Sequence, residues 1–194
     1  MLKPIQRLIE GLYFKIPGNL ALYDQLTHTY NSNWLRSIAY DKYATELCYV
    51  TLVDLNDFKQ INDYIGHFIG DVVLEGIGAY LRTVQEIDPE AEICRSGGDE
   101  FIIFSKIDIT SYLAEDTNQL VSFGTCRKRS NLSIKNAIRI ADARMYKYKK
   151  DNKEIITSRQ DLLDRLHSVS FVNQDSLNET ITAQSYFERQ HGTV

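Results

Sequence analysis

The stretch Arg95-Ser96-Gly97-Gly98-Asp99-Glu100-Phe101 lies between two apolar segments, Ala91–Cys94 and Phe101–Phe104, and decides how the middle of this chain folds. Two adjacent glycines between apolar segments predict a tight hairpin turn, because glycine enters the left-handed backbone region at little cost. Two carboxylates, Asp99 and Glu100, follow the glycines at the hairpin tip. Successive strand residues point to opposite faces, so one carboxylate is suited to holding a metal and the other to acting as a second ligand or a proton acceptor. A solvated acidic turn is the alternative for this run taken alone.

A further carboxylate ends an apolar segment upstream, in Thr51-Leu52-Val53-Asp54, and the segment from Leu55 to Asp71 follows it. A carboxylate at a strand end and two at a neighbouring hairpin tip can converge on a divalent cation, which offsets the charge of nucleotide phosphates. This combination predicts metal-assisted phosphoryl chemistry. A helix cap after the strand is the alternative for Asp54.

Composition limits the function classes. With 194 residues, 43% hydrophobic and 25% charged, the chain has the size of one ordinary core. The 26 acidic against 22 basic side chains argue against a nucleic-acid-binding surface. No apolar run is long enough for a membrane span and the first residues do not resemble a signal peptide, so we expect a cytoplasmic protein. The three cysteines lack metal-ligand spacing and are expected to be buried thiols: Cys48, Cys94 and Cys126.

Helical and strand patterns alternate along the chain. We expect a short helix over 2–14, a helix capped by Asn31 or Ser32, a central strand Glu46–Val53, a helix opened by Gly70-Asp71, a hairpin over 91–106, a strand Leu120–Thr125 and a helix Ser133–Lys149. Helices packed on one sheet that contains an antiparallel hairpin give an α+β fold.

These segments together resemble the GGDEF-domain family of diguanylate cyclases, bacterial signalling enzymes that join two GTP molecules into cyclic di-GMP. The family block D-x-[DN]-x-F-K-x-x-N-D-x-x-G-H-x-x-G-D is filled at every fixed position from Asp54 to Asp71, and Gly-Gly-Asp-Glu-Phe follows downstream. The likeness begins near Asp24 and reaches about Lys153. It implies the family's palm-like, ferredoxin-like sheet with packed helices, as in nucleotide cyclases.

The resemblance also divides the chain. We expect an N-terminal helix and linker over 1–20, a GGDEF domain over 21–155, and a tail over 156–194 that is partly helical or disordered. Fewer residues than usual separate the hairpin from Ser122-Phe123-Gly124, so a family helix is expected to be deleted or reduced to a turn near Ser111–Glu115. The N-terminal helix or the tail is expected to cover the sheet face that this helix normally covers.

The family's functional residues map onto matching positions. The resemblance implies that the metal is held by Asp54, the carbonyl of Leu55, Asp99 and Glu100, with Asp99 and Glu100 catalytic. It implies substrate contacts from Phe58, Lys59, Asn62, His67, Asp71, Gly97, Gly98, Lys149 and Lys153. A carboxylate such as Asp71 accepts both the N1–H and the N2–H₂ donors of guanine. The alternatives are a helix cap for Asp71, a structural hydrogen bond for His67, and a solvated basic helix end for the two lysines.

The implied enzyme is a nucleotidyltransferase that uses Mg²⁺ or Mn²⁺ and releases pyrophosphate. Its product is two-fold symmetric and one chain supplies one nucleotide site, so catalysis requires a homodimer, at least transiently. The alternative is a catalytically silent domain that binds GTP or a cyclic dinucleotide. Two departures favour it: the shortened segment after the hairpin and the pair Asn31-Ser32, where most members have Asn-Arg. The family's product-inhibition motif is absent, because Asp88-Pro89-Glu90-Ala91 stands in its place.

Overall fold

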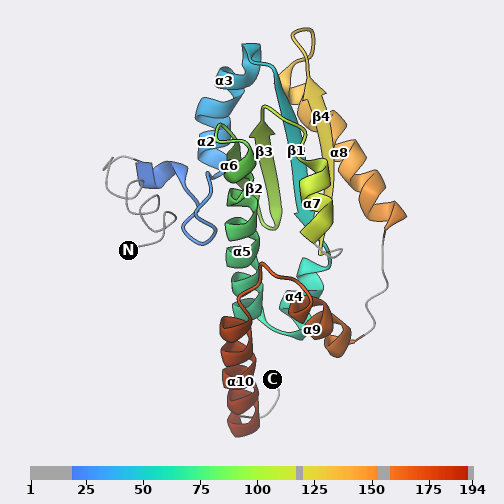
Figure 1. The fold of residues 1–194 in the computed structure, drawn as a ribbon. Helices are drawn as coiled ribbons and strands as arrows, with labels where there is room; N and C mark the ends of the chain where they lie inside the picture. The colour runs from blue at the N-terminus through green and yellow to red at the C-terminus, as the bar shows by residue number, and fades with distance from the viewer. Residues whose placement is uncertain (1–18, 117–119, 153–157, 192–194) are drawn as a thin grey trace.

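The computed structural model in Figure 1 describes residues 19–116, 120–152 and 158–191. A four-stranded antiparallel sheet forms its centre, in the order β2-β3-β1-β4. The strands are β1 (Cys48–Leu55), β2 (Glu92–Gly97), β3 (Glu100–Ser105) and β4 (Val121–Lys128). The α+β class, the hairpin and the central position of the first strand are therefore confirmed. The expected helix over 2–14 and most of the segment 1–20 lie outside the described residues.

One sheet face is covered by helices that follow β1 and β3. These are α4 (Phe58–Tyr64), α5 (His67–Arg82), α6 (Val84–Ile87) and α7 (Thr110–Asp116). Their core includes Val53 and Leu55 of β1, Phe101 and Ile103 of β3, and Val73 and Ile77 of α5, all nearly or fully buried. The alternation along each strand sends odd-numbered β1 residues to this face.

The other face packs on a helical stretch before β1 and on the helix after β4. The stretch consists of α2 (Ser32–Trp34), the π-helical turn η2 (Leu35–Ala39) and α3 (Tyr40–Thr45), after a 3-10 turn η1 (Asn19–Leu22). Asn31 caps α2, as expected, by accepting from the backbone N–H groups of Asn33 and Trp34. On the opposite half lies α8 (Ile134–Asp151), capped by Ser133. Gly124 of β4 lets α8 approach closely, because a Cβ there would overlap backbone atoms of Ala141 and Met145.

The segment between the hairpin and β4 is short but not reduced to a turn. It forms the seven-residue helix α7, which buries Leu113 in the core together with the preceding Ile109. The expectation of a lost or one-turn helix was wrong. These two apolar residues pack on the sheet face, and their burial stabilises the helix there.

The chain beyond the last family motif is folded onto the same core. Helices α9 (Arg159–His167) and α10 (Gln174–His191) follow, and α9 lies beside α4 in Figure 1. Among the described residues of this segment, six apolar side chains are buried in that core: Leu162, Leu163, Leu166, Val169, Val172 and Leu177. Among the described residues, no helix combines the length and apolar character needed to cross a membrane.

The three cysteines are free and buried, as the sequence predicted. Burial raises the pKa of the Cys48 thiol to about 11 and that of the Cys94 thiol to about 12. Both thiols are therefore protonated near neutral pH and behave as small apolar side chains.

Candidate active site

The carboxylates Asp54 and Glu100 lie at one end of the sheet, directly opposite each other. Asp54 is the partner of Glu100 in the β1–β3 register, so both side chains project from the same face. Asp99 immediately precedes β3, and its carbonyl accepts a hydrogen bond of 3.3 Å from the N–H of Leu55. The structure thus brings together the three carboxylates that sequence analysis selected. Asp54 lies inside β1 and the N-cap of α4 is Asp57, so Asp54 does not cap that helix.

The hairpin tip is held by Arg95, a residue to which sequence analysis gave no role. The Arg95 Nε and Nη2 atoms donate to the carbonyl of Gly98 at 2.8 and 2.6 Å, and Nη1 lies 3.1 Å from both carboxylate oxygens of Asp24. Gly98 has φ of +52°, a backbone conformation that favours glycine at this second position of the pair. The strand register shifts between Arg95 and Gly97. Arg95 and Asp24 both belong to segments that resemble the family, but nothing in their spacing along the sequence indicates that they form an ion pair.

Negative charge accumulates at this end of the sheet. Burial and the neighbouring charge of Asp54 raise the pKa of the Asp99 carboxyl. Desolvation, followed by the charges of Asp54, Asp99 and Asp142, raises the pKa of Glu100. Like-charged neighbours favour protonation and also favour any cation that can enter between them.

Lys149 of α8 supplies one such cation. Its Nζ forms an ion pair and hydrogen bond with Oδ1 of Asp54, so this predicted phosphate-binding lysine lies at the carboxylate cluster. The second predicted lysine, Lys153, follows the end of α8 and lies outside the described residues.

The carboxylates suit a divalent cation by their chemistry, although they are not already arranged around one. Across the described ranges, no three His, Cys, Asp or Glu side chains are grouped so that they would hold a metal ion. Hard cations prefer carboxylate and carbonyl oxygens, the donor set predicted from Asp54, Leu55, Asp99 and Glu100. The Leu55 side chain is buried and has no donor atom, so this residue can offer a cation only its main-chain carbonyl oxygen. A cation that binds Oδ1 of Asp54 must compete with Lys149 for that atom.

The turn from β1 to α4 is tightly constrained. The Asn56 N–H donates to the carbonyl of Leu120 at 2.8 Å, and its Oδ1 accepts from the Ser122 hydroxyl at 2.8 Å. Asp57 adopts the left-handed conformation, with φ of +57°. A non-glycine residue in this region costs about 1 kcal/mol or more, so the surrounding contacts must stabilise it.

The next two predicted substrate contacts differ in their environment. Phe58 is half-buried and packs against the core. The side chain of Lys59 is 89% exposed, and its Nζ lies 3.5 Å from a carboxylate oxygen of Asp63 one turn later. The Lys59 ammonium group is therefore accessible to a ligand, whereas the Phe58 ring is partly enclosed by the core.

The two predicted guanine readers lie on α4 and α5, two helices that pack on each other. Asn62 is half-buried against Gly70, where an added Cβ would overlap its Oδ1, and Asp71 follows Gly70 as an exposed residue. The expected helix start at Gly70-Asp71 was wrong. Gly66, with φ of +115°, redirects the chain, so α5 begins at His67 and Asp71 lies inside the helix rather than capping it. His67 is exposed at the first helical position.

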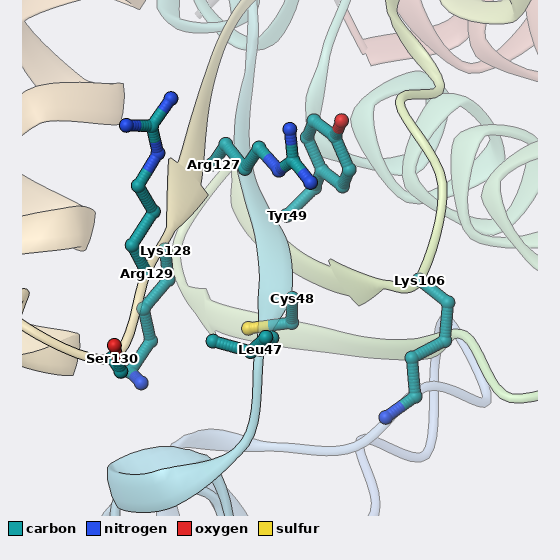
Figure 2. Close-up of a pocket in the computed structure, with 8 residues that line it drawn as sticks. All are labelled: Leu47, Cys48, Tyr49, Lys106, Arg127, Lys128, Arg129 and Ser130. Atoms are coloured by element: carbon teal, nitrogen blue, oxygen red, sulfur yellow. The ribbon is translucent and has the colours of Figure 1, made fainter.

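A separate hollow lies at the other end of β1. It has a volume of about 400 Å³, and Figure 2 shows its lining: Leu47, Cys48, Tyr49, Lys106, Arg127, Lys128, Arg129 and Ser130. Three of its cations have partners: Arg127 lies over the Tyr49 ring at 5.8 Å, Lys106 Nζ lies 2.9 Å from Oε2 of Glu46, and Lys128 Nζ donates to the carbonyl of Glu46 at 2.9 Å. None of the sequence-predicted site residues lines it, so the carboxylate end remains the candidate active site.

Comparison with protein-family models gives a match over residues 21–154 to the family described as diguanylate cyclase, GGDEF domain. The probable diguanylate cyclase DgcI of Escherichia coli is 25% identical over 171 residues, which cover 78% of this chain and 38% of that protein. Diguanylate cyclase DgcP of Escherichia coli is 27% identical over 132 residues, which cover 68% of this chain and 33% of that protein. The chain thus spans about a third of the length of these relatives.

Solved structures show the same fold. A structure describing a novel interaction mode between a microbial GGDEF domain and bis-(3,5)-cyclic di-GMP has a TM-score of 0.57 and 25% identity, covering 69% of this chain and 94% of that one. The coiled coil and GGDEF domain of DgcB from Caulobacter crescentus, in complex with c-di-GMP, has a TM-score of 0.61 and 22% identity, covering 76% and 90%.

Proposed function

This chain belongs to the diguanylate cyclase GGDEF-domain family, and from that premise we propose that it condenses two GTP molecules into cyclic di-GMP and pyrophosphate. The observation that carries the proposal is the pairing of Asp54 with Glu100 across β1 and β3, with Asp99 beside them. Three carboxylates at a strand end form a charge arrangement suited to nucleotidyl transfer. GTP is a cytoplasmic nucleotide, so the proposed activity implies a cytoplasmic location.

The chemistry needs a proton acceptor and compensation of phosphate charge. A 3′-hydroxyl loses its proton and attacks the α-phosphorus, and the bond from that phosphorus to the bridging oxygen breaks to release pyrophosphate. Asp99 and Glu100 are the proposed proton acceptors, because both carboxylates stand at the hairpin tip beside Asp54. A bound Mg²⁺ or Mn²⁺ supplies charge stabilisation for the triphosphate. Lys149, released from Asp54, is placed to contact the same phosphates.

Substrate recognition is assigned to the segments on either side of this cluster. The triphosphate is expected to lie against the turn 56–59 and the hairpin glycines Gly97 and Gly98. The guanine is expected to be read by Asn62 and Asp71, with His67 at the start of α5 beside them. Because each chain offers one such site, two chains must face each other for each 3′-hydroxyl to reach the α-phosphate that the other holds.

Incubation of the purified chain with GTP and MgCl₂, followed by separation of the nucleotides, tests the proposal. We expect cyclic di-GMP and pyrophosphate in a one-to-two ratio, with a rate that rises faster than linearly with protein concentration at low concentration. GTP left unchanged at micromolar protein would contradict the proposed activity.

A silent binding domain is the second candidate. The ion pair of Lys149 with Asp54 favours it, because the ammonium group occupies a carboxylate that the metal needs. The same incubation separates the two: the silent domain binds GTP or cyclic di-GMP by calorimetry and forms no product.

Replacement of Gly70 with alanine is expected to raise the KM for GTP roughly tenfold without unfolding the chain. The new Cβ overlaps Oδ1 of Asn62, the end of a movable side chain, so the amide swings away from the base. Alanine is also the better helix former, which offsets the local crowding. Steady-state kinetics and thermal melting measure the two effects.

Asn62→Ala is the matched variant for this test. Since both substitutions remove the same amide from its position, the double variant should have a KM close to that of either single variant. A wild-type KM in Gly70→Ala, alongside a raised KM in Asn62→Ala, would contradict the role given to this packing contact.

A further inference from the structure

The segment after the family match is built into the domain rather than appended to it. The helix α9 starts with a capping box, in which Ser158 and Asp161 exchange side-chain to backbone hydrogen bonds. Gly76 of α5 allows the chain at Phe171 to pass closely, because a Cβ there would lie 2.6 Å from the Phe171 carbonyl oxygen. Six buried apolar side chains pack this segment into the core that also contains residues of α4 and α5.

One charged side chain of this segment is directed at the proposed site. The side chain of Arg165 on α9 is only 8% exposed, and its Nη1 lies 3.0 Å from Oδ2 of Asp57. A guanidinium so far removed from water requires acceptors, and a carboxylate is the strongest available. Asp57 makes no side-chain bond to cap α4, so its carboxylate points to α9 instead.

The ion pair between Arg165 and Asp57 lies at the constrained turn between β1 and α4. Asp57 is the left-handed residue that joins the Asp54 end of β1 to α4. The neighbouring Asn56 is bound on its other side, to Leu120 and Ser122. The turn is therefore held from β4 through Asn56 and from α9 through Asp57.

We infer that Arg165 is a positioning residue that holds Asp57, and with it the turn 56–59, in the conformation that receives the nucleotide. The positioning of the turn is inferred from the ion pair between Arg165 and Asp57, whereas its effect on GTP binding rests on the proposed function. The tail has its own apolar anchorage, so removal of the ion pair releases the turn and leaves α9 docked. This assigns part of the nucleotide site to a segment beyond residues 21–154.

The test compares Arg165→Gln with Leu166→Ala in the full chain. The first variant removes the charge and keeps most of the side chain, while the second loosens the packing of the same helix by creating a cavity. Arg165→Lys is the conservative rescue, because it keeps the charge without the planar fork. Hydrogen exchange by mass spectrometry, without nucleotide, reports on 56–61 and on 159–177 separately.

In Arg165→Gln we expect amide exchange over 56–61 to quicken roughly tenfold while exchange over 159–177 stays close to wild type. Leu166→Ala should give the reverse pattern, and Arg165→Lys an intermediate rate over 56–61. If Arg165→Gln quickens exchange only over 159–177, Arg165 merely anchors the tail and the inference is overturned. Should that variant fail to fold, Asp57→Asn removes the same pair with a residue that tolerates the left-handed region.

A kinetic measurement then tests the consequence for GTP. Arg165→Gln should raise the KM for GTP roughly tenfold with kcat within about twofold, whereas Leu166→Ala should leave the KM near the wild-type value. If the wild-type chain consumes no GTP, the proposed function fails and the exchange data still decide the positioning role. An unchanged KM in Arg165→Gln, with an active wild type, would overturn the link to the nucleotide.

Discussion

Replacement of Asp99 with alanine is expected to abolish formation of cyclic di-GMP, lowering the rate by at least about a thousandfold. Asp99 lies beside Asp54 and Glu100, and its loss removes both a proposed metal ligand and a proton acceptor. Stability should not fall, because the raised pKa of Asp99 means that the fold disfavours its charged form near neutral pH. Product formation from GTP and MgCl₂, measured beside a thermal melt, distinguishes lost chemistry from lost fold.

Asp142→Asn is the matched control for this experiment. Asp142 is an exposed acid on α8 whose charge also acts on Glu100, but it lies in neither the hairpin nor β1. We expect this control to keep activity within about threefold of wild type, since a solvated charge has a small effect on a buried reaction. Product formed by Asp99→Ala at the wild-type rate would refute the proposed catalytic cluster.

Asp71 is expected to set the choice of base, with GTP preferred over ATP by about three orders of magnitude. A carboxylate pairs with the two adjacent donors of guanine but faces the N1 lone pair of adenine, which leaves its charge unmatched. The structure excludes a helix-cap role for this residue, because α5 begins four positions earlier at His67. In Asp71→Ser the turnover of GTP should fall and some ATP should enter, so mixed nucleotides should give a hybrid dinucleotide.

Glu75→Ser controls for the loss of a carboxylate on the same helix. Glu75 is exposed one turn further along α5, so its removal changes the helix charge without touching the proposed base site. Its GTP to ATP preference should equal that of wild type in a competition assay followed by chromatography. Equal use of both nucleotides by the wild-type chain, or an unaltered preference in Asp71→Ser, would remove Asp71 from base recognition.

Much of the fold follows from local sequence patterns. The continuous apolar run of Glu46–Val53 predicted a strand buried on both faces, and β1 lies between β3 and β4. The glycine pair predicted the hairpin tip, and Ser133 predicted the start of α8. The start of α5 was placed too late, because a positive φ at Gly66 lets the chain enter the helix immediately. The predicted length of α7 was too short, because this helix is stabilised by burial of its apolar side chains against the sheet, and hydrophobic periodicity along the chain does not describe that contact.

By itself, the sequence placed the carboxylates Asp54, Asp99 and Glu100 at a strand end and a hairpin tip, because short-range patterns reveal both features. It assigned Asn62 and Asp71 to the candidate site only through their resemblance to the family motif. Only the tertiary structure decided how charged side chains pair: Lys149 with Asp54, Arg95 with Asp24, and Arg165 with Asp57. The partners are far apart along the chain and come from different elements. Hydrophobic periodicity specifies which face of a helix or strand is buried. The partner of a charged side chain depends instead on the position of a second helix or strand, which is determined by the packing of the core.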